Sequence, residues 1–420
     1  MQTSLLSLIR NLKLNHISRR EKLLLGIFTI WLVIFYINET IVPYGTASKC
    51  KWPSLTTEKS STSEKQSNIL LIADPQLIDN HTYPGRNELL LKLSQHTVDQ
   101  YLKRNYQALQ YQLQPSHIVF LGDLLDNGRA STDEYFNREV ARFKSIFPFG
   151  NNVFTNLPGN HDIGFGDLIR VAVRDRFSRT FGEPNTLLNI NGVDIIMLDT
   201  TSLSSTKDVI RTSAQNFVLQ LPQKTSPRVL FSHVPLFRDI NLSCGPHRES
   251  SHFNVLGHGY QYQNSLVPDI SKQLLDTIEP DLIFSGDDHD YCDIEHEGGV
   301  REITVKSMSM AMGIKYPAVQ LLSFISNGEK MQYKTEICYL QTPYINVVVY
   351  IILAIISIAI ILVQNMRSKL NMRKGQYSIL PLNNYQGNTV YKRRLIVDCF
   401  KECLVAGIGV LCIYRFLIVK

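Results

Sequence analysis

The sequence predicts an α/β domain of two packed mixed β-sheets flanked by helices, with apolar membrane-spanning segments on both sides of it. Three observations lead to this prediction. Short apolar runs typical of buried strands alternate with segments of helical periodicity through the middle of the 420-residue chain. Strand-like segments then follow one another directly, as in a meander. Long apolar stretches without a charge flank this region.

The first apolar stretch, residues 23–43, is uncharged from Leu23 to Ile37 and predicts a short transmembrane helix. Residues 1–22 carry five lysines and arginines and only one acid, Glu21, which places this tail in the cytosol. The alternative is a cleaved signal peptide that ends near residues 45–47. The long basic region before the apolar run favours a retained anchor.

The second apolar stretch, residues 344–363, has no charge and predicts another transmembrane helix. The basic loop that follows, residues 364–394, has seven lysines and arginines and no acid, so we expect it in the cytosol. Residues 395–419 are apolar but include Asp398 and Glu402, which is compatible with a third span or with an interfacial helix.

This topology places a domain at residues 51–341 on the lumenal side of the membrane. Three glycosylation sequons support the placement and predict a glycoprotein: Asn38, Asn80 and Asn241. Four cysteines of this region predict one or two disulfides whose pairing stays open: Cys50, Cys244, Cys292 and Cys338. Much of the net charge of +6 lies beside the apolar stretches, where it sets orientation, so we expect no nucleic-acid partner.

Residues 51–67 are polar and predict a tether, and ten apolar runs then predict strands. These are 68–73, 117–121, 152–156, 186–190, 193–198, 228–231, 282–284, 300–308, 319–325 and 332–340. Helical periodicity falls at 87–111, 131–147, 168–181, 208–221 and 269–278. Ser131 is a candidate cap for the second of these helices, Asn191-Gly192 predicts a hairpin, and residues 245–263 have no regular pattern.

Five strands are followed directly by polar side chains, and strand carboxyl ends meet at one edge of a sheet. The clusters are Asp74 with Gln76, Asp123 with Asp126, Asn160 with His161, His233, and Asp287 with His289. Each alone has an ordinary reading, such as a polar turn or a buried histidine. Together, carboxylate, amide and imidazole groups suit Mn, Fe or Zn. Two divalent ions roughly 3.5–4 Å apart would hold a phosphoester, with Asp123 as the natural bridging carboxylate.

The third cluster lies in a tight turn, Gly159-Asn160-His161-Asp162. Asn160 offers a neutral oxygen ligand, and His161 offers an imidazole that can protonate a leaving group. Asp162 is in position to orient that imidazole. This set of groups predicts metal-assisted phosphoryl transfer.

These motifs resemble the calcineurin-like metallophosphoesterase superfamily, which implies a four-layer αββα fold. The Asp74-Pro75-Gln76 and Asp287-Asp288-His289 variants, with the flanking apolar stretches, resemble the cell division control protein 1 group and its relatives, the post-GPI-attachment phosphodiesterases. The resemblance implies removal of ethanolamine phosphate from a mannose of GPI anchors in the endoplasmic reticulum or Golgi. The implied cofactors are two divalent ions, with Mn first and Mg, Fe or Zn as alternatives.

By the same resemblance, one ion takes Asp74, Gln76, Asp123 and His289, and the other takes Asp123, Asn160, His233 and Asp287. His161 would protonate the leaving oxygen, with Asp126 or Asp162 behind it. Gln76 and Asp287 stand where the common pattern has histidine. Whether Gln76 binds a metal therefore stays open, and the change favours Mn or Mg over Zn.

Four residues that follow the first two motifs are candidates for the substrate pocket: His81, Tyr83, Arg86 and Arg129. An arginine here would pair with phosphate or lie in solvent. The expected partners are a GPI glycolipid or GPI-anchored protein and the lipid bilayer, and no oligomeric state is predicted. Two rival functions remain: a phosphoesterase for another phospholipid or for a phosphoprotein, and a non-catalytic adaptor in GPI-protein export.

Overall fold

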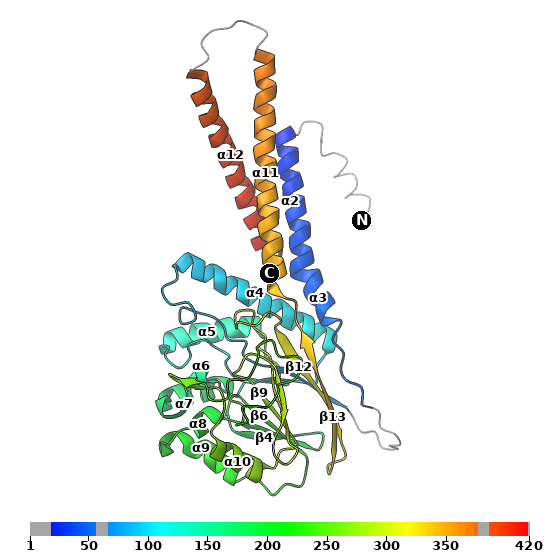
Figure 1. The fold of residues 1–420 in the computed structure, drawn as a ribbon, viewed down its shortest axis with the longest axis vertical. Coiled ribbons are helices and arrows are strands. Elements are labelled where there is room, and N and C mark those ends of the chain that lie inside the picture. The colour runs from blue at the N-terminus through cyan, green and yellow to red at the C-terminus, as the bar shows by residue number, and fades with distance from the viewer. Residues whose placement is uncertain (1–17, 56–65, 377–385, 419–420) are drawn as a thin grey trace. The chain divides into compact units, whose positions relative to one another are not determined.

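The computed structural model describes residues 18–55, 66–376 and 386–418 (Figure 1). The chain forms two compact units: residues 43–342, and residues 1–42 together with 343–420. The first unit contains both β-sheets, and the second contains the long apolar helices.

Two mixed sheets form the centre of the 43–342 unit, which confirms the predicted fold class. The first sheet has the order β13-β12-β1-β2-β3, and the second has the order β10-β11-β9-β6-β5-β4. The first contains β1 (Ser67–Ile72), β2 (His117–Phe120), β3 (Val153–Phe154), β12 (Ala318–Ser326) and β13 (Met331–Tyr339). The second contains β4 (Thr186–Ile190), β5 (Val193–Leu198), β6 (Arg228–Ser232), β9 (Leu282–Ser285), β10 (Cys292–Glu295) and β11 (Arg301–Thr304).

Alternate residues of each central strand enter different cores, which explains why these strands are apolar throughout. In β1, Ile69 and Leu71 pack between the sheets, where they join Phe231 and Phe284 of the second sheet. Leu70 of the same strand packs on the opposite face, beneath helices. Strands buried on both faces are near-continuous apolar runs rather than alternating ones.

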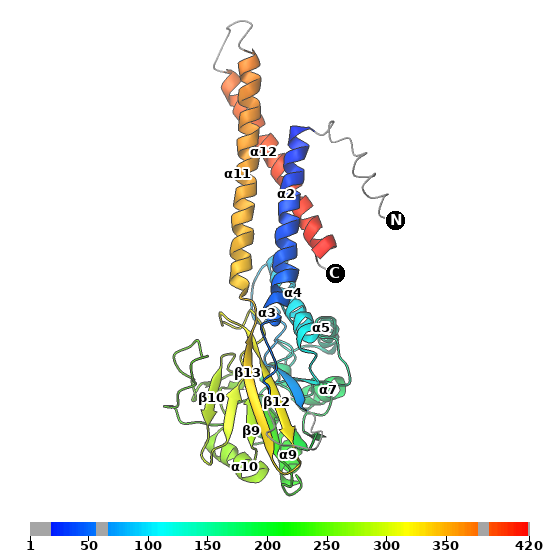
Figure 2. The same ribbon diagram turned by 90° about the vertical axis from the view of Figure 1, so that its right-hand side faces the viewer.

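Helices cover the outer face of each sheet (Figures 1 and 2). Side chains of α4, α5 and α7 pack on the first sheet, and those of α9 and α10 pack on the second. The helices of the unit are α4 (Glu88–Leu113), α5 (Asp133–Ile146), α6 (Asn160–Ile163), α7 (Val171–Phe181), α8 (Thr200–Leu203), α9 (Asp208–Leu219) and α10 (Pro268–Ile278). A 3₁₀ turn, η3 (Gly166–Leu168), and a two-residue hairpin, β7 (His258–Gly259) with β8 (Tyr262–Gln263), complete it.

Three local predictions need correction. Thr132 rather than Ser131 caps α5, because the Thr132 hydroxyl accepts from the Tyr135 amide while Ser131 donates to the Gly128 carbonyl. The predicted helix from residue 168 begins at Val171, after η3. Strand β10 was not predicted, because its polar residues gave no apolar run; its pairing with β11 makes it an edge strand.

All four cysteines of this unit are paired. Cys50 is bonded to Cys338 of β13, and Cys244 is bonded to Cys292 of β10. The sequence predicted one or two bridges and left the pairing open. The structure shows two, each of which joins a loop or linker to a sheet edge.

The other unit contains α2 (Arg19–Tyr36), a π-helical turn η2 (Ile37–Ile41), α11 (Pro343–Gln376), α12 (Gln386–Ile413) and η4 (Tyr414–Ile418), with α3 (Val42–Ala47) at the boundary. Among the described residues, two helices are long and apolar enough to cross a membrane: residues 19–47 and 343–368. Buried Glu402 of α12 pairs with Arg20 of α2 and accepts from the Asn365 amide of α11 at 2.7 Å. α12 therefore packs with both other helices.

The membrane boundaries and the third span at 395–419 stay predictions, as does the cytosolic side of the tail and loop. Residues 1–17 of the predicted tail, 56–65 of the predicted tether, 377–385 of the predicted basic loop and 419 lie outside the described residues.

Candidate metal centre

The ends of strands from both sheets meet at one place, as the sequence predicted. Ligand-capable atoms of Asp74, Asp123 and His233 all lie within 4.8 Å of one another, and all three residues are buried. Asp74 follows β1, Asp123 follows β2 and His233 follows β6. The site therefore lies across the two sheets, where their carboxyl ends adjoin.

His233 is held so that one ring nitrogen faces the other predicted ligands. Its Nδ1 lies 2.7 Å from the Leu121 carbonyl and donates to it. The second nitrogen, Nε2, lies 3.2 Å from Asn160 Oδ1, 3.3 Å from Asp287 Oδ1 and 3.4 Å from Asp123 Oδ1. A backbone bond on one nitrogen that leaves the other free toward oxygen donors is typical of metal-binding histidines.

Two buried oxygens in this cluster have no hydrogen-bond partner within the described parts of the chain: Asp74 Oδ2 and Gln76 Oε1. Gln76 is oriented by its amide nitrogen, which donates to Asp126 Oδ1 at 2.9 Å and leaves Oε1 unpaired. A buried oxygen without a partner is costly, and a cation relieves that cost. The donor set therefore fits divalent ions, and Gln76 fits as one of the donors.

The backbone is strained at the predicted ligands. Nine non-glycine residues in the described chain have positive φ, and five are predicted ligands: Asp74, Gln76, Asp123, Asp287 and His289. Such conformations cost about 1–3 kcal/mol each and persist where the surrounding fold enforces them, often at functional sites. Glycines allow the close packing, because a Cβ on Gly122 would lie 2.4 Å from His233 Nδ1.

Burial raises the pKa of Asp74 well above its usual range, and the nearby Asp123 and Asp287 carboxylates add to the effect. Burial alone would lower the pKa of His233, but Asp123 and Asp287 outweigh it and raise that pKa well above its ordinary value. Both pKa shifts have the same cause. Closely spaced carboxylates lie in a buried site, and they stabilise positive charge there.

His161 lies at the edge of this cluster with its side chain 21% exposed. Its Nδ1 lies 2.6 Å from the Asp126 carbonyl oxygen, and its backbone amide donates to Asp123 Oδ1 at 2.9 Å. Burial opposes protonation, but the Asp123 and Asp126 carboxylates raise the pKa of His161 to about 9. A protonated imidazole held in this way is suited to deliver a proton to a leaving oxygen.

The predicted orienting role of Asp162 is wrong, whereas that of Asp126 is compatible with its contacts. Asp162 accepts from the backbone amides of Gly159, Leu125 and Leu124 at 2.9, 2.9 and 3.1 Å. It therefore holds the loop after β2 against the loop that carries Asn160. The Gly159 amide is free to donate because Gly159 is the N-cap of α6, and the other two amides come from the loop after β2.

The four substrate candidates divide into two pairs. Arg129 donates to the Asn160 carbonyl at 3.0 Å and lies 3.1 Å from His81 Nε2, and the His81 ring lies 5.9 Å from that of His161. These two residues therefore lie at the site. The Arg86 guanidinium instead stacks over Tyr83 and donates to Ser94. In the described chain, no hydrogen bond or ion pair joins Tyr83 or Arg86 to a predicted ligand.

Sequence reasoning missed three contributors. The Thr82 hydroxyl donates to Asp126 Oδ2 at 2.6 Å, and the Asp79 amide donates to the same oxygen at 3.1 Å. Their place a few residues after Asp74 was the available signal. The Gln261 carbonyl accepts from Asn160 Nδ2 at 3.1 Å, and a backbone contact of this kind leaves no trace in the sequence.

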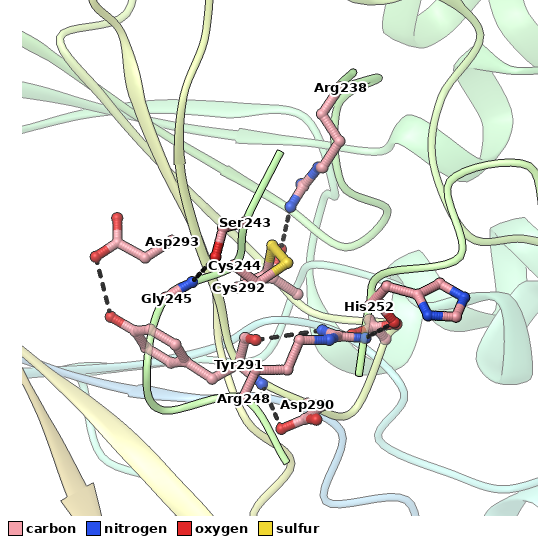
Figure 3. The surroundings of a disulfide bond; sticks show 12 residues. Arg238, Ser243, Cys244, Gly245, Arg248, His252, Asp290, Tyr291, Cys292 and Asp293 are labelled. Carbon is pink, nitrogen blue, oxygen red and sulfur yellow. Dashed lines mark hydrogen bonds and ion pairs between the residues drawn. A yellow bond between two sulfur atoms is a disulfide. The ribbon is translucent and has the colours of Figure 1, made fainter. Parts of the chain in front are cut away.

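The loop with Asp287 and His289 is braced on its other side. Figure 3 shows part of this region, around the Cys244–Cys292 disulfide. Asp288 pairs with Arg248 at 2.5 Å, and Asp290 accepts from the amides of Glu249 and Ser250. The Cys244–Cys292 disulfide joins the same two segments. Asp288 and Asp290 therefore fix the position of the loop that carries the predicted ligands Asp287 and His289.

Replacing Arg248 with alanine is expected to destabilise the 43–342 unit by about 3–5 kcal/mol, because Asp288 would remain buried and unpaired. The side chains of Arg248 and Asp288 are only 6% and 9% exposed. The exposed Arg211–Asp208 pair on α9 provides the control, since Arg211→Ala should cost less than about 1 kcal/mol. Denaturant unfolding of both variants measures the difference, and equal stabilities would contradict the bracing role.

A family model of calcineurin-like phosphoesterases matches residues 67–291. The chain is 38% identical over 344 residues to cell division control protein 1 of Saccharomyces cerevisiae, an alignment that covers 76% of this chain and 69% of that protein. It is 26% identical over 316 residues to metallophosphoesterase 1 of Ailuropoda melanoleuca, in an alignment that covers 70% of this chain and 78% of that protein. A crystal structure of a dimetal phosphatase from Danio rerio aligns at 12% identity and a TM-score of 0.38, over 66% of this chain and 99% of its own.

The fold and the site thus define a metal-dependent phosphoesterase with a dinuclear divalent metal centre. The chain belongs to the calcineurin-like phosphoesterase family.

Each group at the site has a definable task. Two divalent ions, when bound, polarise the phosphoryl oxygens and stabilise the charge that develops on them. Arg129 is fixed by the Asn160 carbonyl and holds a positive charge beside the site. The Asp123 and Asp126 carboxylates raise the pKa of His161 and so favour its protonated form beside the site. The Gln261 carbonyl fixes the Asn160 amide so that its oxygen faces His233.

Proposed function

We propose that this protein is a membrane-anchored phosphodiesterase that removes ethanolamine phosphate from a mannose of GPI anchors, with manganese as its metal. One observation carries the proposal. A phosphoesterase site and two helices apolar and long enough to span a membrane occur in the same chain, on both sides of the catalytic unit. Anchors of this kind keep a site close to the bilayer, where a lipid-linked substrate lies. The GPI substrate itself is what the resemblance to the cell division control protein 1 group implies.

Two features support a lumenal site in the endoplasmic reticulum or Golgi. Both disulfides lie in the 43–342 unit, and such bonds form and persist in oxidising compartments. Two of the sequons, Asn80 and Asn241, lie on exposed parts of the same unit. We propose the residue roles given by the resemblance: Asp74, Gln76, Asp123 and His289 for one ion, Asp123, Asn160, His233 and Asp287 for the other, and His161 as proton donor.

Glycosylation tests the orientation directly. The chain expressed in eukaryotic cells is expected to shift in electrophoretic mobility after glycosidase treatment, because the sequons at Asn80 and Asn241 would face the lumen. The double variant Asn80→Gln/Asn241→Gln should lose most of that shift. A chain that is membrane-bound but never glycosylated would place the catalytic unit in the cytosol and exclude the proposed substrate.

The rival phosphoesterase reading shares the chemistry and differs in the substrate. The adaptor reading is less well supported, because a degenerate relative would be expected to lose the bridging acid or the proton donor. Here Asp123, Asn160 and His161 are all present. The His161 amide donates to Asp123, and His233 lies beside both Asp123 and Asn160.

The deciding experiment uses the full chain in detergent, reloaded with Mn, and offers three substrates. These are a synthetic mannoside that carries phosphoethanolamine, a chromogenic phosphodiester and its monoester. The proposal expects cleavage of the mannoside to mannose and phosphoethanolamine, with the diester preferred over the monoester, and loss of both activities in His161→Ala. Preference for the monoester would indicate a phosphatase. Cleavage of the diester without cleavage of the mannoside would contradict the GPI assignment.

A further inference from the structure

A groove of about 460 Å³ lies beside the metal centre, in the range of small-molecule sites, about 300–1,000 Å³. It is formed by residues 255–268, which include the β7–β8 hairpin, together with η3 and neighbouring residues. Its lining combines apolar side chains, such as Phe165, Leu168 and Leu256, with polar ones, such as His258 and Gln263.

Gln261 connects the groove to the metal centre. Its side chain lies in the groove lining, and its backbone carbonyl accepts from Asn160 Nδ2 at 3.1 Å and from Arg129 Nη1 at 3.4 Å. Asn160 is a predicted ligand, and Arg129 is a candidate phosphate contact. Gln261 therefore belongs to the groove lining and also contacts a predicted ligand, which places the groove next to the metal centre.

The groove lining includes an aromatic ring and hydrogen-bonding atoms that are still available. Tyr262 is 43% exposed, and its ring lies against Gly259, where an added Cβ would fall 2.3 Å from the ring. His258 uses Nδ1 to donate to the Leu256 carbonyl, and Gln263 uses Nε2 to donate to Ser265. Within the described chain, the Tyr262 hydroxyl, His258 Nε2 and Gln263 Oε1 have no hydrogen-bond partner.

These properties favour a sugar over an acyl chain. A hydrocarbon that filled the groove would remove water from three polar atoms and give them no partner, which costs about 1–3 kcal/mol for each group. A hexose offers hydroxyl groups to such atoms and an apolar C–H face to a tyrosine ring. A lining that combines apolar and polar side chains therefore suits a ligand with both an apolar face and hydroxyl groups, such as a sugar.

We infer that the groove formed by residues 255–268 and η3 binds the mannose chain of the substrate and so determines specificity. This inference deepens the proposed function and rests on it for the identity of the sugar. Tyr262 and Gln263 act as binding residues for the glycan, at a distance from the phosphoester. The hydrogen bond from Asn160 to the Gln261 carbonyl fixes the position of the groove relative to the loop that carries Asn160.

The first test measures binding without chemistry, with phosphate-free mannotriose as the probe and saturation-transfer NMR on the full chain. Wild type is expected to bind, and Tyr262→Ala should weaken binding by roughly 3- to 10-fold, the loss expected for one aromatic contact. Tyr316→Ala is the matched control, since Tyr316 is 41% exposed and lies outside the groove lining. Absence of mannotriose binding to wild type, or equal binding to Tyr262→Ala, would overturn the inference. Octanoate binding that depends on Tyr262, without mannotriose binding, would identify an acyl site and would also overturn it.

The second test measures selectivity as the ratio of kcat/KM for the phosphoethanolamine mannoside to that for the chromogenic diester. This ratio is expected to fall roughly 3- to 10-fold in Tyr262→Ala, through KM, and to stay constant in Tyr316→Ala. These measurements distinguish failure of the proposed reaction from failure of the proposed glycan groove. Tyr262-dependent binding of mannotriose without cleavage of the mannoside would contradict the proposed reaction and support the groove. Cleavage of the mannoside with an unchanged ratio in Tyr262→Ala would support the reaction and overturn the groove.

Discussion

Asp123→Asn is expected to lower diester cleavage by roughly 10³-fold, because several kcal/mol of charge stabilisation depend on the metal ions that this carboxylate would bridge. Its Oδ1 lies 3.4 Å from His233 Nε2 and accepts from the His161 amide at 2.9 Å. An asparagine keeps the shape and an oxygen for that amide, but it removes the charge that two cations would share. Metal content measured on the same sample should therefore fall together with activity.

The control for this variant is Asp208→Asn on α9, whose carboxylate is exposed. It should keep metal content, activity and stability. If Asp123→Asn retained two ions per chain and was nevertheless inactive, the bridging role would be wrong. Full activity of Asp123→Asn would contradict the location of the metal centre altogether.

Gly159→Ala is expected to have the second largest effect, and it acts through packing rather than charge. A Cβ at this position would lie 2.0 Å from Asp123 Oδ1 and 2.3 Å from the Asp123 backbone nitrogen. The loop after β2 cannot retreat easily, because Asp162 binds its amides at Leu124 and Leu125. Overpacking of this kind costs about 1–3 kcal/mol or more. The thermal midpoint of the metal-free chain should fall by several degrees, and metal binding should weaken.

Gly150→Ala is the matched control for this prediction. An added Cβ there would approach only the flexible Asn152 side chain, at 3.1 Å, so little change is expected in stability or metal content. A Gly159→Ala variant as stable and as metal-rich as Gly150→Ala would show that the two loops are less closely packed than the structure indicates.

The sequence predicted the layers and the meeting of strand ends well, for physical reasons. β1 enters both cores with alternate side chains, so its whole length is apolar, and its end is marked by the abrupt change to Asp74-Pro75-Gln76. The hairpin at Asn191-Gly192 was equally plain, because positive φ at both residues requires such a pair. Local chemistry determines these features, so a local pattern reveals them.

Features that depend on distant contacts were not predictable in the same way. Asp162 follows His161 directly, and adjacency suggested a contact that the fold does not make, because the Leu124 and Leu125 amides compete for that carboxylate. β10 is an edge strand whose identity comes from its partner β11. The Gln261 contact uses a backbone carbonyl, which any residue type supplies. The pairing of the four cysteines depended on the arrangement of the sheets.

The roles of three arginines also became clear only from the folded structure. Arg248 lies in a region without regular pattern, and its side chain is buried against Asp288. Arg86 was a candidate phosphate contact and instead stacks on Tyr83. Arg129 was an equal candidate and lies at the site. Position along the chain could not separate these three arginines, because their partners come from other segments.

We propose that five strand ends build one dinuclear metal centre and that this centre cleaves a phosphodiester. The most direct measurement is metal stoichiometry and turnover of the chromogenic diester on one preparation of the full chain, before and after chelation and reloading with Mn. We expect about two ions per chain and activity that is lost on chelation and restored with the ions. In Asp123→Asn, neither the ions nor the activity should be recovered. A folded chain that binds no divalent ion, or whose turnover does not change on chelation, would contradict it.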